Sequence, residues 1–88
     1  LTMIEAYAHH YRAFEDCADM LFNFVLYCLS AGIFKTLTSK EQHIVCLRIL
    51  KGKHTEACCK QLKLSGKKYL DVTLRSSIST LLKLSAYS

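Results

Sequence analysis

The chain of 88 residues contains no proline, no tryptophan and only three glycines. Proline and glycine interrupt regular structure, so their scarcity argues against a loop-rich chain and favours helices joined by short connections. Apolar residues make up 51% of the sequence, which is too many for an intrinsically disordered protein. We therefore predict a small all-α domain with one modest hydrophobic core, with or without an appended arm.

The sequence also lacks a long apolar run. The longest, Met20 to Leu29, spans ten residues and is interrupted by Asn23. A membrane-spanning helix needs about 20 apolar residues. The first residues show no basic segment ahead of an apolar one, as a secretory signal would. We expect a cytoplasmic protein that does not enter the membrane.

Five cysteines form an odd set with no Cys-x-x-Cys spacing. Cys58 and Cys59 are adjacent, and neighbours on a helix point about 100° apart, so they cannot easily form a disulfide with each other. The pattern indicates reduced cysteines that serve as small buried apolar residues. A redox-sensing thiol is an alternative, because lysines flank this pair and would lower the pKa of an exposed thiol.

Metal and enzyme sites have little support in the sequence. His54, Cys58 and Cys59 could supply three zinc ligands, but a structural zinc site needs four and no second pair lies nearby. A catalytic cysteine would need an oriented base and a pocket, which a short helical chain does not indicate. We expect no metal, no cofactor and no enzymatic activity.

Charge is distributed unevenly along the chain. Residues 1–34 hold one arginine against four acidic residues, a net charge of −3. Residues 35–88 hold nine lysines and two arginines against three acidic residues, a net charge of +8. A basic segment with a helical pattern is typical of proteins that bind polyanions, and nucleic acid is the commonest of these. A lysine-rich surface that contacts only water is the alternative.

Residues 3–31 carry apolar residues at alternating spacings of three and four, which predicts one long amphipathic helix ended by Gly32. In its second half the apolar face widens to most of the circumference, and such a helix must be buried. We predict that a second copy of the chain covers it, giving a homodimer through an arm of residues 1–36. Packing onto the chain's own C-terminal part, or onto another domain, is the alternative. The predicted dimerisation residues are Ile4, Tyr7, Tyr11, Phe14, Leu21 and Val25.

A second helical region begins at Thr38. Thr38 and Glu41 have the spacing of a capping box, in which each side chain binds a backbone N–H of the other residue. This pair predicts a helix over 38–50 that ends before Gly52. A short helix over 55–62 is expected to follow, with Thr55 as its N-cap.

The last predicted helix runs over 65–84, with Ser65 as its N-cap. Leucine and isoleucine recur along one face of it and form a thin buried stripe. The opposite face is basic and rich in hydroxyl groups. A helix of this kind suits insertion into a nucleic-acid groove, because one side anchors it and the other meets phosphates and base edges.

Several of these residues occur together in a known pattern. The opening Leu37-Thr38-Ser39-Lys40-Glu41 leads into an apolar helix, Gly52 follows after a one-residue insertion, and Leu64-Ser65 follows a second apolar set. The pattern resembles the LuxR/FixJ/NarL-type (GerE-like) helix-turn-helix of bacterial transcription regulators, over residues 37–82. The chain departs from that family at Ala57, where glutamate is usual, at Lys63, where glycine is usual, and at Asp71, which falls on the face expected to meet DNA. The match also requires a second inserted residue near Lys68 and Tyr69.

The resemblance implies a helix-turn-helix bundle over 37–88 whose third helix enters the major groove and whose last helix often helps dimerise. It divides the segment after Ser65 into two helices near Ser76, whereas the periodicity predicts one. The implied function is sequence-specific binding of double-stranded DNA in transcription regulation. Arg75 is the best candidate for a base contact, because its planar fork suits guanine. The full set of predicted DNA contacts is Lys53, His54, Thr55, Lys60, Lys67, Lys68, Thr73, Arg75 and Ser76.

Two other functions remain open. The acidic, strongly apolar N-terminal segment could instead make the chain a helical protein-interaction or oligomerisation module without DNA binding. RNA binding by the basic half is a third possibility. It normally uses aromatic side chains that stack on bases, and Tyr69 alone is thin support for it.

Overall fold

A computed structural model describes residues 2–86. All regular secondary structure in this part of the chain is helical, and it contains no strand. The all-α prediction is confirmed for this part of the chain. A 3₁₀ turn occupies Phe34–Thr36, and a π-helical turn occupies Cys46–Leu50. The five α-helices are α1 (Thr2–Ala8), α2 (Phe14–Ser30), α3 (Ser39–Val45), α4 (Thr55–Leu62) and α5 (Lys67–Ser85).

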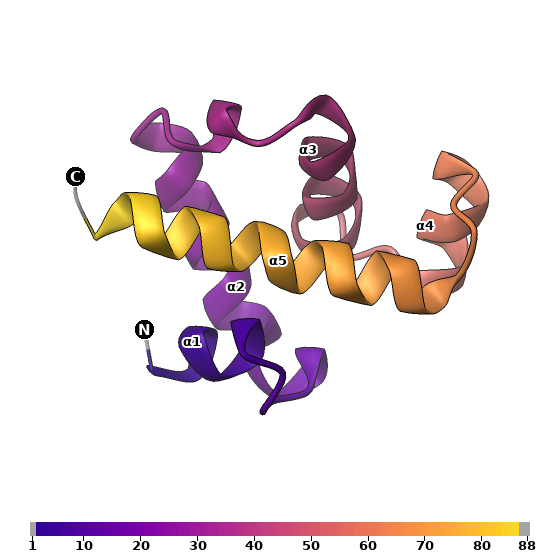
Figure 1. Cartoon of the computed structure of the whole chain (residues 1–88), viewed down its shortest axis with the longest axis horizontal. Coiled ribbons are helices and arrows are strands. Elements are labelled where there is room, and N and C mark those ends of the chain that lie inside the picture. The colour runs from indigo at the N-terminus through magenta and orange to yellow at the C-terminus, as the bar shows by residue number, and fades with distance from the viewer. Residues whose placement is uncertain (1, 87–88) are drawn as a thin grey trace.

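Helix α5 lies across the middle of the molecule and contacts three other helices (Figure 1). Helix α1 packs on one side of it, α3 packs on the other, and α4 lies at the end where α5 begins (Figure 1). The buried residues form a single core cluster to which both the first 36 residues and the rest of the chain contribute. The N-terminal segment therefore packs against the C-terminal part of its own chain.

The predicted long N-terminal helix is wrong, because the chain turns sharply between α1 and α2. His10 adopts a left-handed backbone with φ of 73°, and Ala13 is extended. A straight helix over 3–31 would be about 43 Å long at 1.5 Å per residue, whereas the longest dimension of the chain is 34 Å. The turn lets α1 fold back onto α2 and α5, which buries apolar surface that one continuous helix would leave uncovered.

The predicted dimerisation stripe is divided by this turn. Ile4, Tyr7, Leu21 and Val25 are buried in the core of the chain itself. Phe14 is half-buried, and Tyr11 is the most exposed of the large apolar side chains that the structure describes, at 81%. These residues therefore do not form one face that a second copy could cover.

Helix α2 keeps much of its apolar surface in solvent. Its buried stripe accounts for only part of the circumference, as the wide apolar face in the sequence implied. The large side chains on the remaining surface are 39–49% exposed. They are Met20, Phe22, Leu26, Tyr27 and Leu29.

Helix α3 begins with the predicted capping box. The backbone N–H of Glu41 donates to the Thr38 hydroxyl at 3.2 Å, and the N–H of Thr38 donates to the Glu41 carboxylate at 2.8 Å. The helix continues into the π-turn, where the N–H of Lys51 donates to the carbonyl of Cys46 at 2.9 Å. A wide turn of this kind accommodates one residue more than an ordinary helical turn.

The boundaries of the last two helices match the predicted segments, but their N-caps differ. Helix α4 is preceded by His54 rather than capped by Thr55, and α5 is preceded by Gly66 rather than capped by Ser65; neither residue offers a side-chain cap. Helix α5 runs unbroken through Ser76 and Ser77, as its periodicity predicts. Ser77 is buried there and donates to the Thr73 carbonyl at 2.8 Å. Among residues 2–86, no helix is long and apolar enough to cross a membrane.

Candidate nucleic-acid interface

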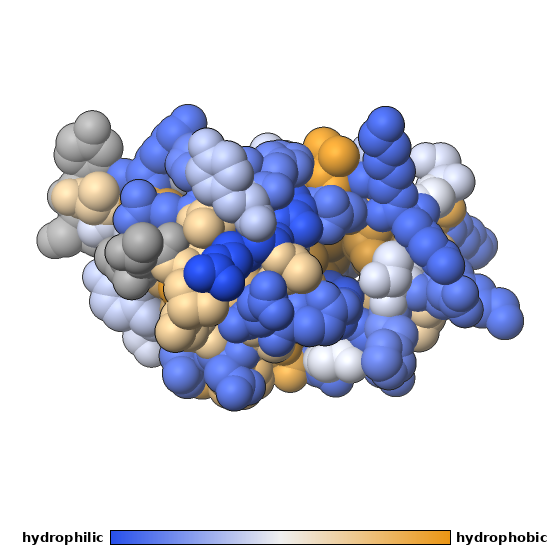
Figure 2. Space-filling model, turned by 90° about the horizontal axis from the view of Figure 1, so that it is seen from below, coloured by the Kyte–Doolittle hydropathy of each residue, from blue (hydrophilic) through white to orange (hydrophobic). Residues whose placement is uncertain are grey.

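Basic side chains gather at the end of the molecule formed by α4 and its two flanking turns. Residues 51–68 hold six lysines and a single acidic residue, Glu56. All six lysines are exposed, and long hydrophilic side chains project at this end in Figure 2. We call this surface the basic end: Lys51, Lys53, Lys60, Lys63, Lys67 and Lys68.

The turn between α4 and α5 sets the position of the central lysine of the basic end. Lys63 ends α4 in the left-handed conformation, with φ of 55° and ψ of 45°. The next N–H, of Leu64, donates to the carbonyl of Cys59 at 2.9 Å, which satisfies one of the last carbonyls of the helix. Lysine is costly in this conformation and glycine is not.

One lysine of the basic end forms an ion pair. Lys67 Nζ lies 3.0 Å from Glu56 Oε1, and both side chains are exposed. The hydrogen bond from Lys67 and its charge lower the pKa of Glu56. Exposed pairs of this kind contribute little stability, so the pair reduces the positive charge of the surface without fixing its shape.

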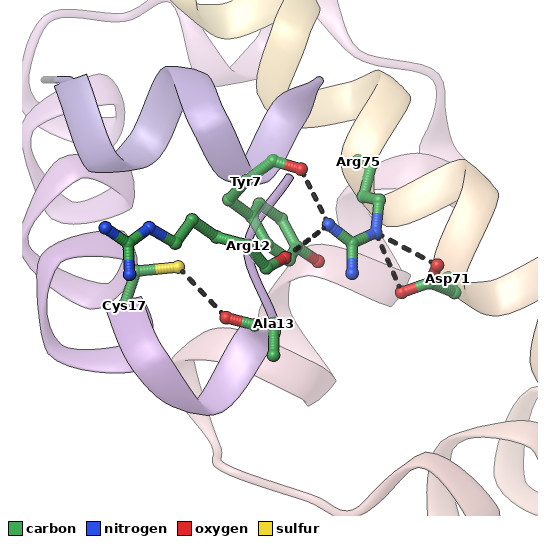
Figure 3. Close-up of polar contacts among 6 residues, drawn as sticks. All are labelled: Tyr7, Arg12, Ala13, Cys17, Asp71 and Arg75. Carbon is green, nitrogen blue, oxygen red and sulfur yellow. Dashed lines mark hydrogen bonds and ion pairs between the residues drawn. The ribbon is translucent and has the colours of Figure 1, made fainter. Parts of the chain in front are cut away.

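Arg75 is occupied within the fold. Its guanidinium donates to both oxygens of Asp71, at 3.1 and 2.9 Å, and to the carbonyls of Tyr7 and Arg12, at 2.7 and 2.8 Å (Figure 3). The side chain is only 11% exposed. A guanidinium held by four hydrogen bonds is not available to a base edge, so Arg75 leaves the set of expected DNA contacts.

The other predicted contacts lie on the surface in two groups. Lys53, His54, Lys60, Lys67 and Lys68 are exposed around α4, with half-buried Thr55 beside them. The second group, exposed Ser76 and half-buried Thr73, lies further along α5. The structure thus places most of the predicted phosphate contacts together but removes the principal base contact.

Sequence reasoning missed part of this surface. Tyr69 and Val72 are 39% and 46% exposed on α5. With Ser76 they follow the spacings i, i+3 and i+7, which align residues along one helix face. The Lys40 ammonium lies over the Tyr69 ring, 4.8 Å from its centroid, and adds a positive charge beside this face. The same spacing was readable in the sequence, opposite the stripe that contains Leu70 and Leu74.

The cysteines do not form a reactive centre in the described structure. Cys17, Cys28 and Cys58 are buried, and Cys46 and Cys59 are half-buried against the core, which confirms the packing interpretation. Burial raises the pKa of Cys58, which disfavours the thiolate that redox chemistry needs. Among residues 2–86, no three metal-ligating side chains come together at a possible metal site.

Comparison with protein-family models, with curated proteins and with solved structures found no match.

Proposed function

We propose that the chain binds double-stranded DNA through the basic end and the outward face of α5. The observation that carries this proposal is the concentration of six exposed lysines around α4, against one acidic residue in the same stretch. Lysines that neutralise phosphates release condensed counterions and supply most of the affinity for DNA. Of the acidic residues of the first 34 positions, Glu15 lines a surface hollow together with His54 and Lys67.

Two features of the fold support a role for α4 and α5 as a helix-turn-helix in transcription regulation. First, the π-turn at Cys46–Leu50 lies where the sequence has its extra residue relative to the LuxR/FixJ/NarL-type pattern. Second, Lys63 has the left-handed backbone that suits the glycine usual in that pattern. The first inserted residue and Lys63 therefore each have a local structural accommodation.

Because Arg75 is bound to Asp71, Tyr7 and Arg12, other residues on the outward face of α5 must make the base contacts. Val72 offers an apolar surface of the kind that contacts the thymine methyl group, and Ser76 offers a hydroxyl. Lys68 and Tyr69 lie one turn earlier on the helix. We expect this face to favour thymine at the position that Val72 meets, because its side chain can contact the thymine methyl group.

The test is a salt titration of binding to a labelled duplex, followed by fluorescence anisotropy. The double variant Lys60→Gln/Lys63→Gln should bind more weakly and lower the slope of log K against log salt by about 2, at ~0.9 per phosphate contact. The matched control Lys35→Gln/Lys83→Gln removes the same charge from exposed positions outside the basic end. Equal losses in both double variants, or no salt-dependent binding by the folded protein, would contradict the proposal.

A second candidate function is self-association through α2, which the exposed apolar side chains of that helix favour. Leu26 and Leu29 lie on one side of the buried stripe, and Met20 and Tyr27 lie on the other. A second copy that packed along α2 would remove these surfaces from water. The test is sedimentation of Leu26→Glu. The variant should move a dimer to the monomer mass, and a wild-type chain that is already monomeric excludes this function.

A further inference from the structure

Helix α2 carries an apolar stripe that lies outside its buried residues. Phe22, Leu26 and Leu29 follow the spacings i, i+4 and i+7, which align side chains along one face of a helix. They are 39%, 43% and 43% exposed. We call these three residues the α2 stripe. Large apolar side chains in a row on one face are suited to burial against a second helix.

The charges at the two ends of the α2 stripe have opposite signs. Asp19 lies three residues before Phe22, on the same face and exposed. Helix α2 itself contains no basic residue, and the first one after it is Lys35. The Lys35 side chain lies beside Gly32, just past the end of α2, because its Cε is 4.0 Å from the place that a Cβ on Gly32 would take.

These two charges have no partner within the part of the chain that the structure describes. Neither Asp19 nor Lys35 forms an ion pair there, and both side chains are exposed. Asp19 and Gly32 are separated by roughly 20 Å along α2 at 1.5 Å per residue, so Asp19 does not reach the Lys35 of its own chain. A second α2 that runs in the opposite direction brings the two charges together.

We propose that two copies of the chain pair through the α2 stripe, with their α2 helices antiparallel across a two-fold axis. The register that sets Phe22 opposite the partner's Leu29 also brings Leu26 next to the axis. It sets Asp19 level with the end of the partner's α2, beside the partner's Lys35. The two-fold axis repeats each of these contacts. The inference rests on the self-association proposed above, to which it adds the orientation of the copies and the charges that fix it.

Charge decides between the two possible orientations. A parallel pair would set the acidic starts of both α2 helices side by side, and like charges that face each other are destabilising. The antiparallel pair replaces this repulsion by two attractions between Asp19 and Lys35. Exposed ion pairs are weak and screened by salt. We therefore expect a reversible dimer whose fraction rises with protein concentration and falls with salt.

The first experiment maps the axis by disulfide crosslinking of the full chain with diamide as the oxidant. Leu26→Cys should give a crosslinked dimer, because residue 26 meets its own counterpart at the axis. Leu29→Cys is the matched control, since both leucines are 43% exposed. Its counterparts would lie about 10 Å apart along the helices, and a disulfide needs Cα atoms within about 7 Å. The wild type reports any crosslink through its native cysteines.

The second experiment measures the charges by sedimentation over a range of concentrations. Asp19→Asn and Lys35→Gln should each weaken the dimer by about threefold to tenfold, because each removes both ion pairs. The double variant Asp19→Lys/Lys35→Glu should restore wild-type association, since the reversed pair attracts equally. Glu5→Gln and Lys83→Gln make the same changes of charge at exposed positions outside the interface and should have no effect.

The possible outcomes separate this inference from the proposals above. A chain that stays monomeric up to millimolar concentration overturns both the inference and the self-association, and it leaves the α2 stripe to a different kind of partner. A dimer that Leu29→Cys crosslinks as readily as Leu26→Cys, or that Asp19→Asn strengthens, is parallel, which overturns the inference alone. So does a dimer that neither cysteine variant crosslinks, or one that ignores the charges of Asp19 and Lys35. No measurement here involves DNA.

Discussion

The guanidinium of Arg75 lies over the ring of Tyr7, 4.3 Å from its centroid, and donates to the carbonyl of the same residue at 2.7 Å. A further hydrogen bond reaches the carbonyl of Arg12, on the far side of the turn between α1 and α2. One side chain of α5 therefore holds both the end of α1 and the turn that follows it. Cation–π contact and charge-assisted hydrogen bonds act together here.

Removal of the Arg75 guanidinium should lower the stability of the fold and leave the preference for particular DNA sequences unchanged. We expect Arg75→Ala to lower the free energy of unfolding by about 2–3 kcal/mol, because two backbone carbonyls lose their charged donor. Arg75→Lys should recover only part of this loss, since an ammonium group lacks the planar fork. Urea denaturation measures the change, with Lys83→Ala as the control at an exposed position of the same helix.

For Tyr7→Phe we expect no loss of stability, in contrast to Arg75→Ala. The variant removes a buried hydroxyl that has no partner and keeps the ring under the Arg75 guanidinium. We expect the free energy of unfolding to stay equal or to rise by about 0.5–1 kcal/mol. Thermal denaturation measures it. A clear loss of stability would show that the hydroxyl is already satisfied in the folded protein.

Lys63→Gly should separate stability from DNA binding. Glycine adopts the left-handed backbone of this position without steric cost, so the free energy of unfolding should rise by about 0.5–1 kcal/mol. Affinity for duplex DNA should fall, because the basic end loses one charge. His10→Gly relieves the same kind of backbone conformation outside the basic end, and it should raise stability without any effect on DNA affinity.

Stability should also fall at alkaline pH. Burial raises the pKa of Cys28 from 9.0 to about 11, so the folded thiol keeps its proton where the unfolded thiol has lost it. The folded state then binds more protons, and stability decreases as pH rises from 9 towards 11, by up to ~1.4 kcal/mol per pH unit for one group. Urea denaturation at several pH values measures this slope, and Cys28→Ala should reduce it. An unchanged slope in that variant would assign the effect to other groups.

Much of the architecture could be predicted from local sequence signals. The Thr38–Glu41 capping box, the left-handed Gly32 and the unbroken stripe of α5 all depend on residues close in sequence, and all are present. The turn at residues 9–13 was missed because the heptad pattern continues through it. Tyr11 fits that pattern in the sequence, yet it is exposed because the chain turns one residue before it.

The candidate site was harder to predict, for a related reason. The basic end follows from a run of lysines that is visible in the sequence, so most of its members were identified. The loss of Arg75 depends on Tyr7 and Arg12, which lie 68 and 63 residues away along the chain. Periodicity places Arg75 on a polar face of the helix but does not reveal which segment packs against that face. Contacts of this range require the tertiary fold.

The π-turn at Cys46–Leu50 holds one residue more than an α-helical turn would hold at the same place. Loss of one residue there would convert the π-turn into an ordinary α-helical turn. Helices α3 and α4 would keep their positions and the faces that they bury. Loss of a single residue at this point is therefore a change that the protein can accommodate locally. Chains that differ by one residue between Glu41 and Gly52 can share the same arrangement of α3, α4 and α5.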